Sequence, residues 1–446
     1  MSGPKDDKPG PSRRGFLAGA GGLVAGAGAM LGARGAPALA ATPPGSPGVV
    51  NAEIEPFWGS HQAGIVSPQQ GHTYFAAFDL VTPKREDVIA LLRRWTEASA
   101  RMSAGQRVQA FKQDADYADA DPVEAADSAE AMGLPAARLT LTFGVGAGLF
   151  VKDGKDRYGV AARRPEALVD LPRFNGDQLA DARTGGDLSV QACADDPQVA
   201  FHAVRQLARL ADDAARMRWA QTGFAASAGG GETPRNLMGF RDGTNNPSIR
   251  DADAMGKIVW VGNEGPEWMR GGSYVVVRRI RIALEHWDRM KLAFQEQTVG
   301  RRKYSGAPLG KESELDPLDL DATDKDGNPV IAENAHVRLA AAASNEGAQI
   351  LRRPYSYNDG VNFTAERWPP WRQGMEYDAG LLFICYQSDP RSGFIKIFEK
   401  MAKFDMMNQF ATHTGGGLFA CPGGVAPGEF IAQRLFLGDS NDRAGL

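Results

Sequence analysis

The stretch Leu188–Ala211, LSVQACADDPQVAFHAVRQLARLA, contains the pattern from which the fold can be read. An apolar run typical of a buried strand comes first, a short polar turn with a proline follows, and a helical pattern completes it. Apolar residues in the last part recur at three-residue steps, which predicts one apolar stripe along an amphipathic helix. The stripe consists of Phe201, Val204, Leu207 and Leu210. The stretch is therefore expected to be a strand followed by a helix.

Three other segments share this form, and their spacing indicates an internal repeat. They are residues Tyr74–Ser99, Ser273–Phe294 and Leu381–Phe404. In the last of them, Leu381–Tyr386 is a continuous apolar run, as in a strand covered on both faces. The first two starts lie about 114 residues apart and the last two about 108, as if one unit of two strand–helix pairs occurred twice.

Further strand candidates lie between these pairs, at Leu139–Gly144 and Phe150–Val151 in the first half. The order strand–helix–strand–strand–helix–strand is the ferredoxin-like pattern. We therefore expect an α+β protein made of two tandem ferredoxin-like domains, each an antiparallel sheet with helices. The expected domains are residues 41–225 and 226–446, because a Gly-rich run at 229–231 marks the boundary.

Size, charge and cysteine content narrow the function. A chain of 446 residues is long enough for at least two cores. The net charge of the chain is -4. Because the first 40 residues carry +3, the residues after them are mildly acidic and unsuited to binding nucleic acid. Three scattered cysteines exclude a disulfide framework and a CxxC metal cage. No CxxCH motif is present, so no c-type haem is attached covalently.

Residues 1–40 resemble an export signal. Adjacent arginines open the motif Ser12–Leu17, SRRGFL, an uncharged Gly/Ala-rich run follows, and Ala38-Leu39-Ala40 suits a signal peptidase. The paired arginines favour the twin-arginine route and a periplasmic or extracellular destination. The alternative is a membrane anchor, but Gly and Ala bury little apolar area, so cleavage is favoured. Because this route carries folded proteins, often loaded with a cofactor, a cofactor is expected.

The segment Gly239–Pro247, GFRDGTNNP, is dense in residues that bend or stiffen the backbone. Glycines on both sides of Asp242 let the main chain approach a flat ligand while one carboxylate points at it. The alternative is an ordinary Asx-type turn.

Downstream, His336 is a candidate metal ligand, although a histidine at the edge of a buried segment can also be a core or surface residue. Arg352 and Arg353 follow in the segment ILRRPYSY (350–357), which is expected to be an extended strand. Neighbouring side chains of a strand point to opposite faces, so only one of the two arginines can face a given pocket.

Together these segments resemble the dye-decolorising peroxidases, and in particular their exported deferrochelatase/peroxidase branch. GFRDGTNNP matches the family's GxxDG signature, and six further blocks match in order across nearly the whole chain after the leader. The blocks are FWGSHQAGI (57–65), GGSYVVVRRIRI (271–282), QEQTVGRRKYSGAPL (295–309), ILRRPYSY (350–357), GLLFICYQ (380–387) and GGGLFACPGG (415–424).

The resemblance implies a haem peroxidase. One noncovalent haem b per chain would lie in the C-terminal domain, with His336 as the proximal iron ligand and Asp405 as the acceptor that orients it. On the opposite face Asp242 would transfer the proton of hydrogen peroxide and Arg352 would stabilise the developing negative charge.

Other cofactor contacts and partners follow from the same resemblance. Gly243, Thr244 and Asn245 would line the haem, and Arg338 or Arg353 would bind a propionate, because the alanines after Leu339 replace the basic residues often found there. Bulky organic donors such as dyes or phenols would deliver electrons through surface aromatic residues, for which the candidates are Tyr304, Trp368 and Trp371. A homodimer is the expected assembly.

Several alternatives stay open at this point. The protein could serve an iron-uptake system as a deferrochelatase that releases iron from haem, or it could be a haem-free module that kept the fold. The glycines at 144–148 suggest a weak nucleotide site, and the Asp-rich stretch 316–328 could bind a cation. Cys421 could serve as a thiolate ligand, although a buried inert thiol is the favoured interpretation.

Overall fold

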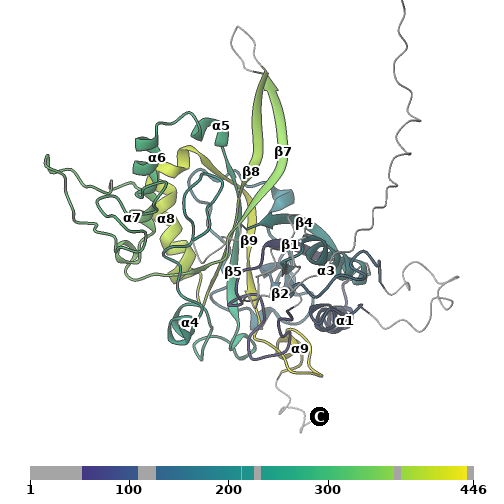
Figure 1. The fold of residues 1–446 in the computed structure, drawn as a ribbon. Helices are drawn as coiled ribbons and strands as arrows, with labels where there is room; N and C mark the ends of the chain where they lie inside the picture. The colour runs from purple at the N-terminus through teal and green to yellow at the C-terminus, as the bar shows by residue number, and fades with distance from the viewer. Residues whose placement is uncertain (1–52, 109–126, 212, 226–232, 366–372, 439–446) are drawn as a thin grey trace, which may run out of the picture. The chain divides into compact units, whose positions relative to one another are not determined.

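Eight antiparallel strands close into a ring in the computed structural model, which describes residues 53–108, 127–211, 213–225, 233–365 and 373–438 (Figure 1). The strands pair in the order β5-β9-β2-β3-β1-β4-β7-β8, and β8 pairs back with β5. The strands are β1 (His72–Leu80), β2 (Thr140–Val145), β3 (Leu188–Ala194), β4 (Ala215–Phe224), β5 (Ser273–Ile282), β6 (Leu351–Arg352), β7 (Tyr355–Ala365), β8 (Gln373–Gln387) and β9 (Ala411–Cys421). The short β6 pairs with β8 beyond the end of β7.

Two seams divide this ring into halves. A single residue pair, Val145 with Ala420, joins β2 to β9, and a single pair, Phe224 with Ser356, joins β4 to β7. Each half therefore has four extensively paired strands, in the order β4-β1-β3-β2 in one and β9-β5-β8-β7 in the other. The described residues nevertheless belong to one compact unit, which spans residues 50–446.

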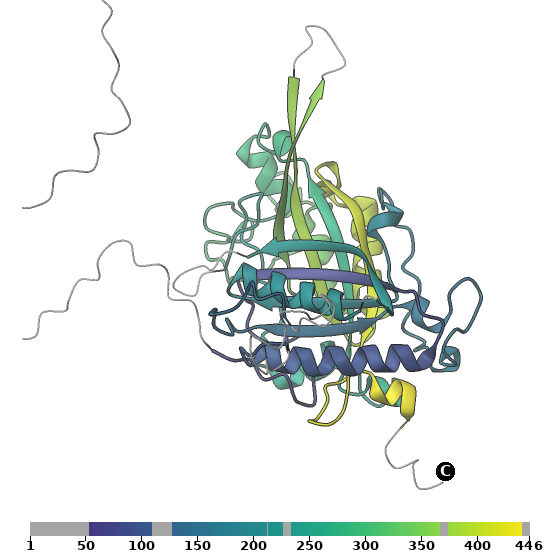
Figure 2. The same ribbon diagram turned by 90° about the vertical axis from the view of Figure 1, so that its right-hand side faces the viewer.

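Helices pack on the outside of the ring. They are α1 (Arg85–Ser103), α2 (Ala147–Phe150), α3 (Pro197–Leu210), α4 (Ala252–Ile258), α5 (Leu284–Trp287), α6 (Leu292–Val299), α7 (His336–Ala340), α8 (Lys396–Phe404) and α9 (Gln433–Leu437). Figure 2 shows α1 running alongside the strands of the first half. The long helices α1 and α3 contact each other there, and the Trp95 indole of α1 donates a hydrogen bond of 2.8 Å to the Leu207 carbonyl of α3. On the other side α7 packs against α8.

The four predicted strand–helix segments are confirmed, with two corrections of detail. In α3 the buried residues include Val199, Ala203, Val204 and Leu207, whereas Phe201 is 45% exposed. A step of three residues drifts around a helix of 3.6 residues per turn, so the apolar stripe was wrong at this position. The expected strand at Phe150–Val151 was also wrong, because Phe150 ends the short helix α2.

Local sequence explains where α3 begins. The Asp196 side chain accepts hydrogen bonds from the amides of Gln198 and Val199, and Pro197 occupies the first helical position. A proline loses nothing there, because the first amide of a helix has no partner within it.

The interior of the ring is a second core, distinct from the one under the helices. Buried residues from strands of both halves meet there, among them Phe75, Trp219, Val277 and Tyr386. On the outer face of the second half, the alternate residues of β5 and β8 point instead toward α7 and α8, which positions the site described below. No helix within the described ranges is both long and apolar enough for a membrane span.

Candidate active site

A cavity of about 270 Å³ lies on the outer face of the second half. Its sheet wall comes from β5, β8 and β9, its helical wall from α7 and α8, and its third wall from the loop that contains Asp242. Most of the lining is apolar, including Ile280, Phe383, Phe394 and Met401. A mostly apolar hollow with a few convergent polar groups is typical of a small-molecule or cofactor site.

His336 is the first residue of α7 and lines this cavity. Its Nδ1 lies 2.7 Å from Oδ2 of Asp405, the residue that follows α8. The other carboxylate oxygen of Asp405 accepts the amide of Met407 at 2.8 Å, which holds the carboxylate in place. The imidazole is 37% exposed and the carboxylate 2%, so the exposed edge of the ring, with Nε2, faces the cavity.

The negative charge of Asp405 beside His336 suits a histidine that binds a metal. Burial lowers the pKa of the imidazole, but Asp405 outweighs burial and raises the pKa above its ordinary value. A carboxylate on one ring nitrogen makes the other a stronger electron donor and fixes the orientation of the ring. His336 and Asp405 therefore have the arrangement of a metal-binding imidazole and a carboxylate that orients it.

Asp242 and Arg352 form the second polar pair on the cavity wall. The Arg352 Nη1 donates to Oδ1 of Asp242 at 2.8 Å, and both side chains are partly buried, at 28% and 15% exposed. Arg352 lies in β6 and Asp242 in the loop after β4, so 110 residues separate them. Both charges act on the pKa of His336, so the two polar pairs lie close enough to interact.

The loop that contains Asp242 depends on its glycine and on a distant acid. Gly243 has φ of 129°, a conformation that other residues rarely adopt. Thr244 donates its hydroxyl to Oε1 of Glu314 at 2.8 Å, and the Arg241 Nε lies 3.1 Å from Oε2 of the same carboxylate. Gly243, Thr244 and the exposed Asn245 line the cavity, and Glu314 holds the loop from outside.

The two arginines expected at a propionate do not line the cavity. The Arg338 guanidinium donates to the carbonyls of Leu320 and Ile331. Arg353 points to the opposite face of its strand from Arg352, where it is 4% exposed and donates to Ser67 and Gln70. Because neighbouring side chains of a strand point to opposite faces, Arg353 points away from the cavity that Arg352 lines. The guanidinium of Arg338 is occupied by backbone carbonyls.

Sequence reasoning missed other polar residues at the site. His413 of β9 lines the cavity, where burial and nearby Arg278 lower its pKa to about 3, so the ring is neutral at physiological pH. Arg301 lines it too, and its Nη1 donates to the carbonyls of Gly306 and Glu314. Asn246 binds the backbone of Arg352 through its side chain. Asn246 and Arg301 lie in sequence blocks named above, at 239–247 and 295–309, whereas His413 lies outside all of them.

Two alternative sites lose their support. Burial raises the pKa of the Cys421 thiol, and Cys421 packs in the core inside the ring and away from the cavity wall. The glycines near residue 146 serve close packing, because a Cβ at Gly146 would meet the Gly186 carbonyl at 2.0 Å and one at Gly148 would meet Asp187.

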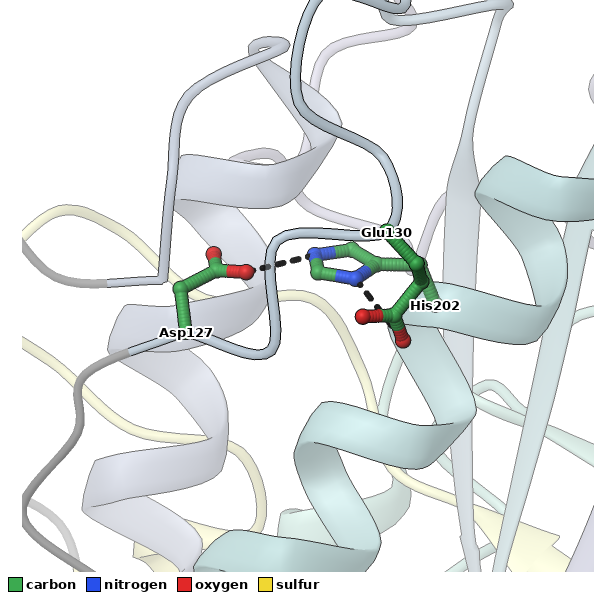
Figure 3. A group of neighbouring side chains, drawn as sticks. All are labelled: Asp127, Glu130 and His202. Atoms are coloured by element: carbon green, nitrogen blue, oxygen red, sulfur yellow. Dashed lines mark ion pairs between the residues drawn. The ribbon is translucent and has the colours of Figure 1, made fainter. Parts of the chain in front are cut away.

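A second cluster of potential metal ligands lies in the first half, where Asp127, Glu130 and His202 converge (Figure 3). The His202 Nε2 lies 3.6 Å from Asp127, whereas its Nδ1 lies 3.2 Å from Glu130. Figure 3 shows the imidazole ring of His202 between the two carboxylates. One ligand atom from each of the three residues lies within 4.8 Å of the other two, so the group is also close enough together to hold a metal ion. The geometry fits a histidine that bridges two carboxylates.

Comparison with known proteins decides the family. The model of the Dyp-type peroxidase N-terminal region matches residues 62–225, and that of the C-terminal region matches residues 233–426. The chain belongs to the Dyp-type peroxidase family. Among its relatives, a dye-decolorizing peroxidase of Thermobifida fusca is 37% identical, with 98% of this chain and all of that protein covered. A deferrochelatase of Escherichia coli is also 37% identical, with 95% and 97% covered.

Solved structures agree with this assignment. A DyP-type peroxidase of Streptomyces coelicolor is similar with a TM-score of 0.77 and 40% identity, over 88% of this chain and all of that one. The resemblance to dye-decolorising peroxidases is confirmed, and this Dyp-type protein is a haem peroxidase.

The residues of the cavity fit haem. Iron takes an imidazole whose second nitrogen is held by a carboxylate, and the apolar walls suit the faces of a porphyrin. His336 with Asp405 supplies that donor set in the wall of the cavity. This Dyp-type cavity therefore has what noncovalent haem b needs.

Proposed function

We propose that Asp242, Arg352 and His336 carry out the peroxidase reaction of this protein, with bulky organic molecules as electron donors. The observation that supports the proposal is their convergence: two polar pairs of 2.7 and 2.8 Å, each made across a long sequence separation, line one apolar cavity. Haem held by His336 would supply the redox chemistry by which peroxide is reduced and a donor is oxidised.

Each residue then has a distinct task. Asp242 accepts a proton from hydrogen peroxide and returns it to the oxygen that leaves as water, as a general base and acid. Arg352, whose Nη1 donates to Asp242 at 2.8 Å, directs positive charge toward the oxygen that gains electrons. Asp405 holds the His336 ring and strengthens it as a ligand.

The test of these roles is the rate of reaction with peroxide. We expect Asp242→Asn to bind haem normally but to react with peroxide about 100-fold more slowly, or worse, because the amide cannot transfer the proton. Arg352→Leu should also slow this step. Stopped-flow mixing of haem-loaded protein with peroxide, followed at the Soret band, measures the rate.

The matched control is Asp319→Asn, which changes an exposed acid whose partner is Lys311. It should leave the peroxide reaction unchanged. If Asp242→Asn reacts as fast as the control, the assigned proton transfer is wrong.

A second candidate function is release of iron from haem in an iron-uptake system. It is favoured by the relative named deferrochelatase, which is as similar to this chain as the dye-decolorizing peroxidase is. Both activities would use the same cavity. Incubation of the haem-loaded protein under reducing conditions distinguishes them: release of iron with recovery of intact, metal-free porphyrin supports the second function, and retention of the haem supports the first alone.

Other features of the chain extend the proposal. Residues 1–40 would direct export by the twin-arginine route to the periplasm or beyond, followed by cleavage. The two halves of the ring would be ferredoxin-like domains, at about 41–225 and 226–446, since each half has the strand order 4-1-3-2 when its own strands are numbered from one. A homodimer and components of an iron-uptake system are the proposed partners.

Surface aromatic residues would pass electrons from donors too large for the cavity. Tyr304 is 74% exposed, which suits such a relay. Trp368 and Trp371 lie outside the described residues.

A further inference from the structure

Arg352 is held by its main chain as well as by its side chain. The Asn246 Oδ1 accepts the Arg352 amide at 2.8 Å, and the Asn246 Nδ2 donates to the Arg352 carbonyl at 2.8 Å. One carboxamide therefore closes a ring of two hydrogen bonds on one residue of β6.

The geometry of β6 explains why this contact is needed. Arg352 lies opposite Cys385 of β8, and the next residue, Arg353, donates its amide to the Ile384 carbonyl of β8 at 2.8 Å. In an antiparallel ladder successive residues direct their amides and carbonyls to opposite sides. The amide and carbonyl of Arg352 therefore point away from β8, and the Asn246 side chain takes the place of a neighbouring strand.

The same loop also supplies the acid that binds the guanidinium. Asp242 accepts a hydrogen bond from Nη1 of Arg352. Between Asp242 and Asn246 lies a turn in which the Asn246 amide donates to the Gly243 carbonyl at 2.8 Å. The segment 242–246 thus makes three hydrogen bonds of 2.8 Å to Arg352, two to its backbone and one to its side chain.

We propose that Asn246 is a positioning residue, which holds the backbone of Arg352 in register with Asp242 so that the guanidinium reaches both the acid and bound peroxide. This proposal rests on the functions proposed for Asp242 and Arg352. The loop that carries Asn246 also carries Asp242, so loss of the backbone contact shifts Arg352 relative to the acid that its guanidinium must reach. A misplacement of about 1 Å can cost about 100-fold in rate.

The test is a double-mutant cycle in the haem-loaded protein. Asn246→Ala should slow the reaction with peroxide by about 10- to 100-fold, while the affinity for haem stays within about twofold of wild type. In an Arg352→Leu background the same change should have less than about a twofold effect, because Asn246 acts through Arg352. A merely structural contribution would slow the reaction by the same factor in both backgrounds.

Two further variants make the result decisive. Asn246→Asp keeps the size of the side chain and the acceptor for the Arg352 amide but loses the donor, so it should fold and show a smaller loss of rate than Asn246→Ala. Asn328→Ala, which removes an exposed asparagine bonded only within its own loop, should leave every value unchanged.

Equal factors in the two backgrounds, or an Asn246→Ala rate equal to wild type, would overturn the inference. If Arg352→Leu and Asp242→Asn also react at the wild-type rate, the proposed function fails instead.

Discussion

At the scale of single residues, the site rests on contacts between side chains far apart in sequence. His336 and Asp405 are 69 positions apart, and Arg352 and Asp242 are 110 apart. Each contact joins a charged group to a partner at the edge of an apolar cavity, where low polarity strengthens the interaction. Truncation of one partner therefore leaves the other without its compensating charge.

Asp405→Asn tests the proximal pair. The amide cannot carry the charge that strengthens His336 as a ligand, so we expect haem affinity to fall about 10- to 100-fold and the reduction potential of the bound haem to become more positive. Haem titration and spectroelectrochemistry measure the two quantities. The control is Asp389→Asn, an acid paired with exposed Arg391, and equal values for both variants would contradict the assigned contact.

For single residues, sequence motifs were a better guide to the cavity wall than residue chemistry alone. Asp242 and Arg352 lie together on the cavity wall, as the GxxDG resemblance implied. Arg338 and Arg353 are propionate candidates only because they are basic, and the structure gives their guanidinium groups other partners. Composition alone cannot tell which side of a strand an arginine occupies.

At the scale of elements, loops hold the acid side of the cavity in place. Glu314 reaches Thr244 and Arg241 of the Asp242 loop from a segment some 70 residues away. Burial acts to raise the pKa of the Glu314 carboxyl, but contacts with Thr233, Thr244 and Arg241 outweigh burial and hold that pKa below its ordinary value. A group whose folded pKa is lowered stabilises the fold only while it is ionised.

We therefore expect Glu314→Gln to destabilise the protein by about 2 kcal/mol at neutral pH, since it weakens hydrogen bonds to a charged group. The deficit should be complete above about pH 4.3 and should shrink as the pH falls further, because the wild-type carboxyl then becomes protonated as well. Denaturant unfolding at several pH values measures it. Glu312→Gln alters an exposed neighbour and serves as control, and a deficit that persists in acid would refute the explanation.

Strands and helices were more predictable than loops. Apolar runs and helical spacing located the strand–helix pairs, because burial on one face leaves a period in the sequence. Loop contacts such as those of Asn246 and Glu314 leave no period, so nothing but the motif around Asp242 indicates them. The seams of the ring were equally invisible, since one residue pair defines each of them.

At the scale of the whole molecule, the two halves share their cores. The core inside the ring combines Phe75 and Trp219 of the first half with Val277 and Tyr386 of the second. The core under the helices likewise joins Trp95 and Leu207 to Trp268 and Phe430. Neither half can therefore expose its inner face without breaking the core of the other.

This arrangement predicts one cooperative unfolding transition. Because both cores include residues of both halves, circular dichroism and tryptophan fluorescence should report the same midpoint during denaturant unfolding of the haem-free protein. Two separate midpoints would show that the halves are independent domains with cores of their own. The two halves match separate N- and C-terminal family models, so the number of midpoints shows whether they unfold as one unit.

The most direct measurement concerns the ligand of the iron. Titration of the haem-free protein with ferric haem should give the Soret band of a histidine-ligated haem at one equivalent per chain, and His336→Ala should lose that band or weaken binding severely. His286→Ala, which alters an exposed histidine outside the cavity wall, should bind haem as wild type does. An unchanged Soret band and affinity in His336→Ala would contradict the account.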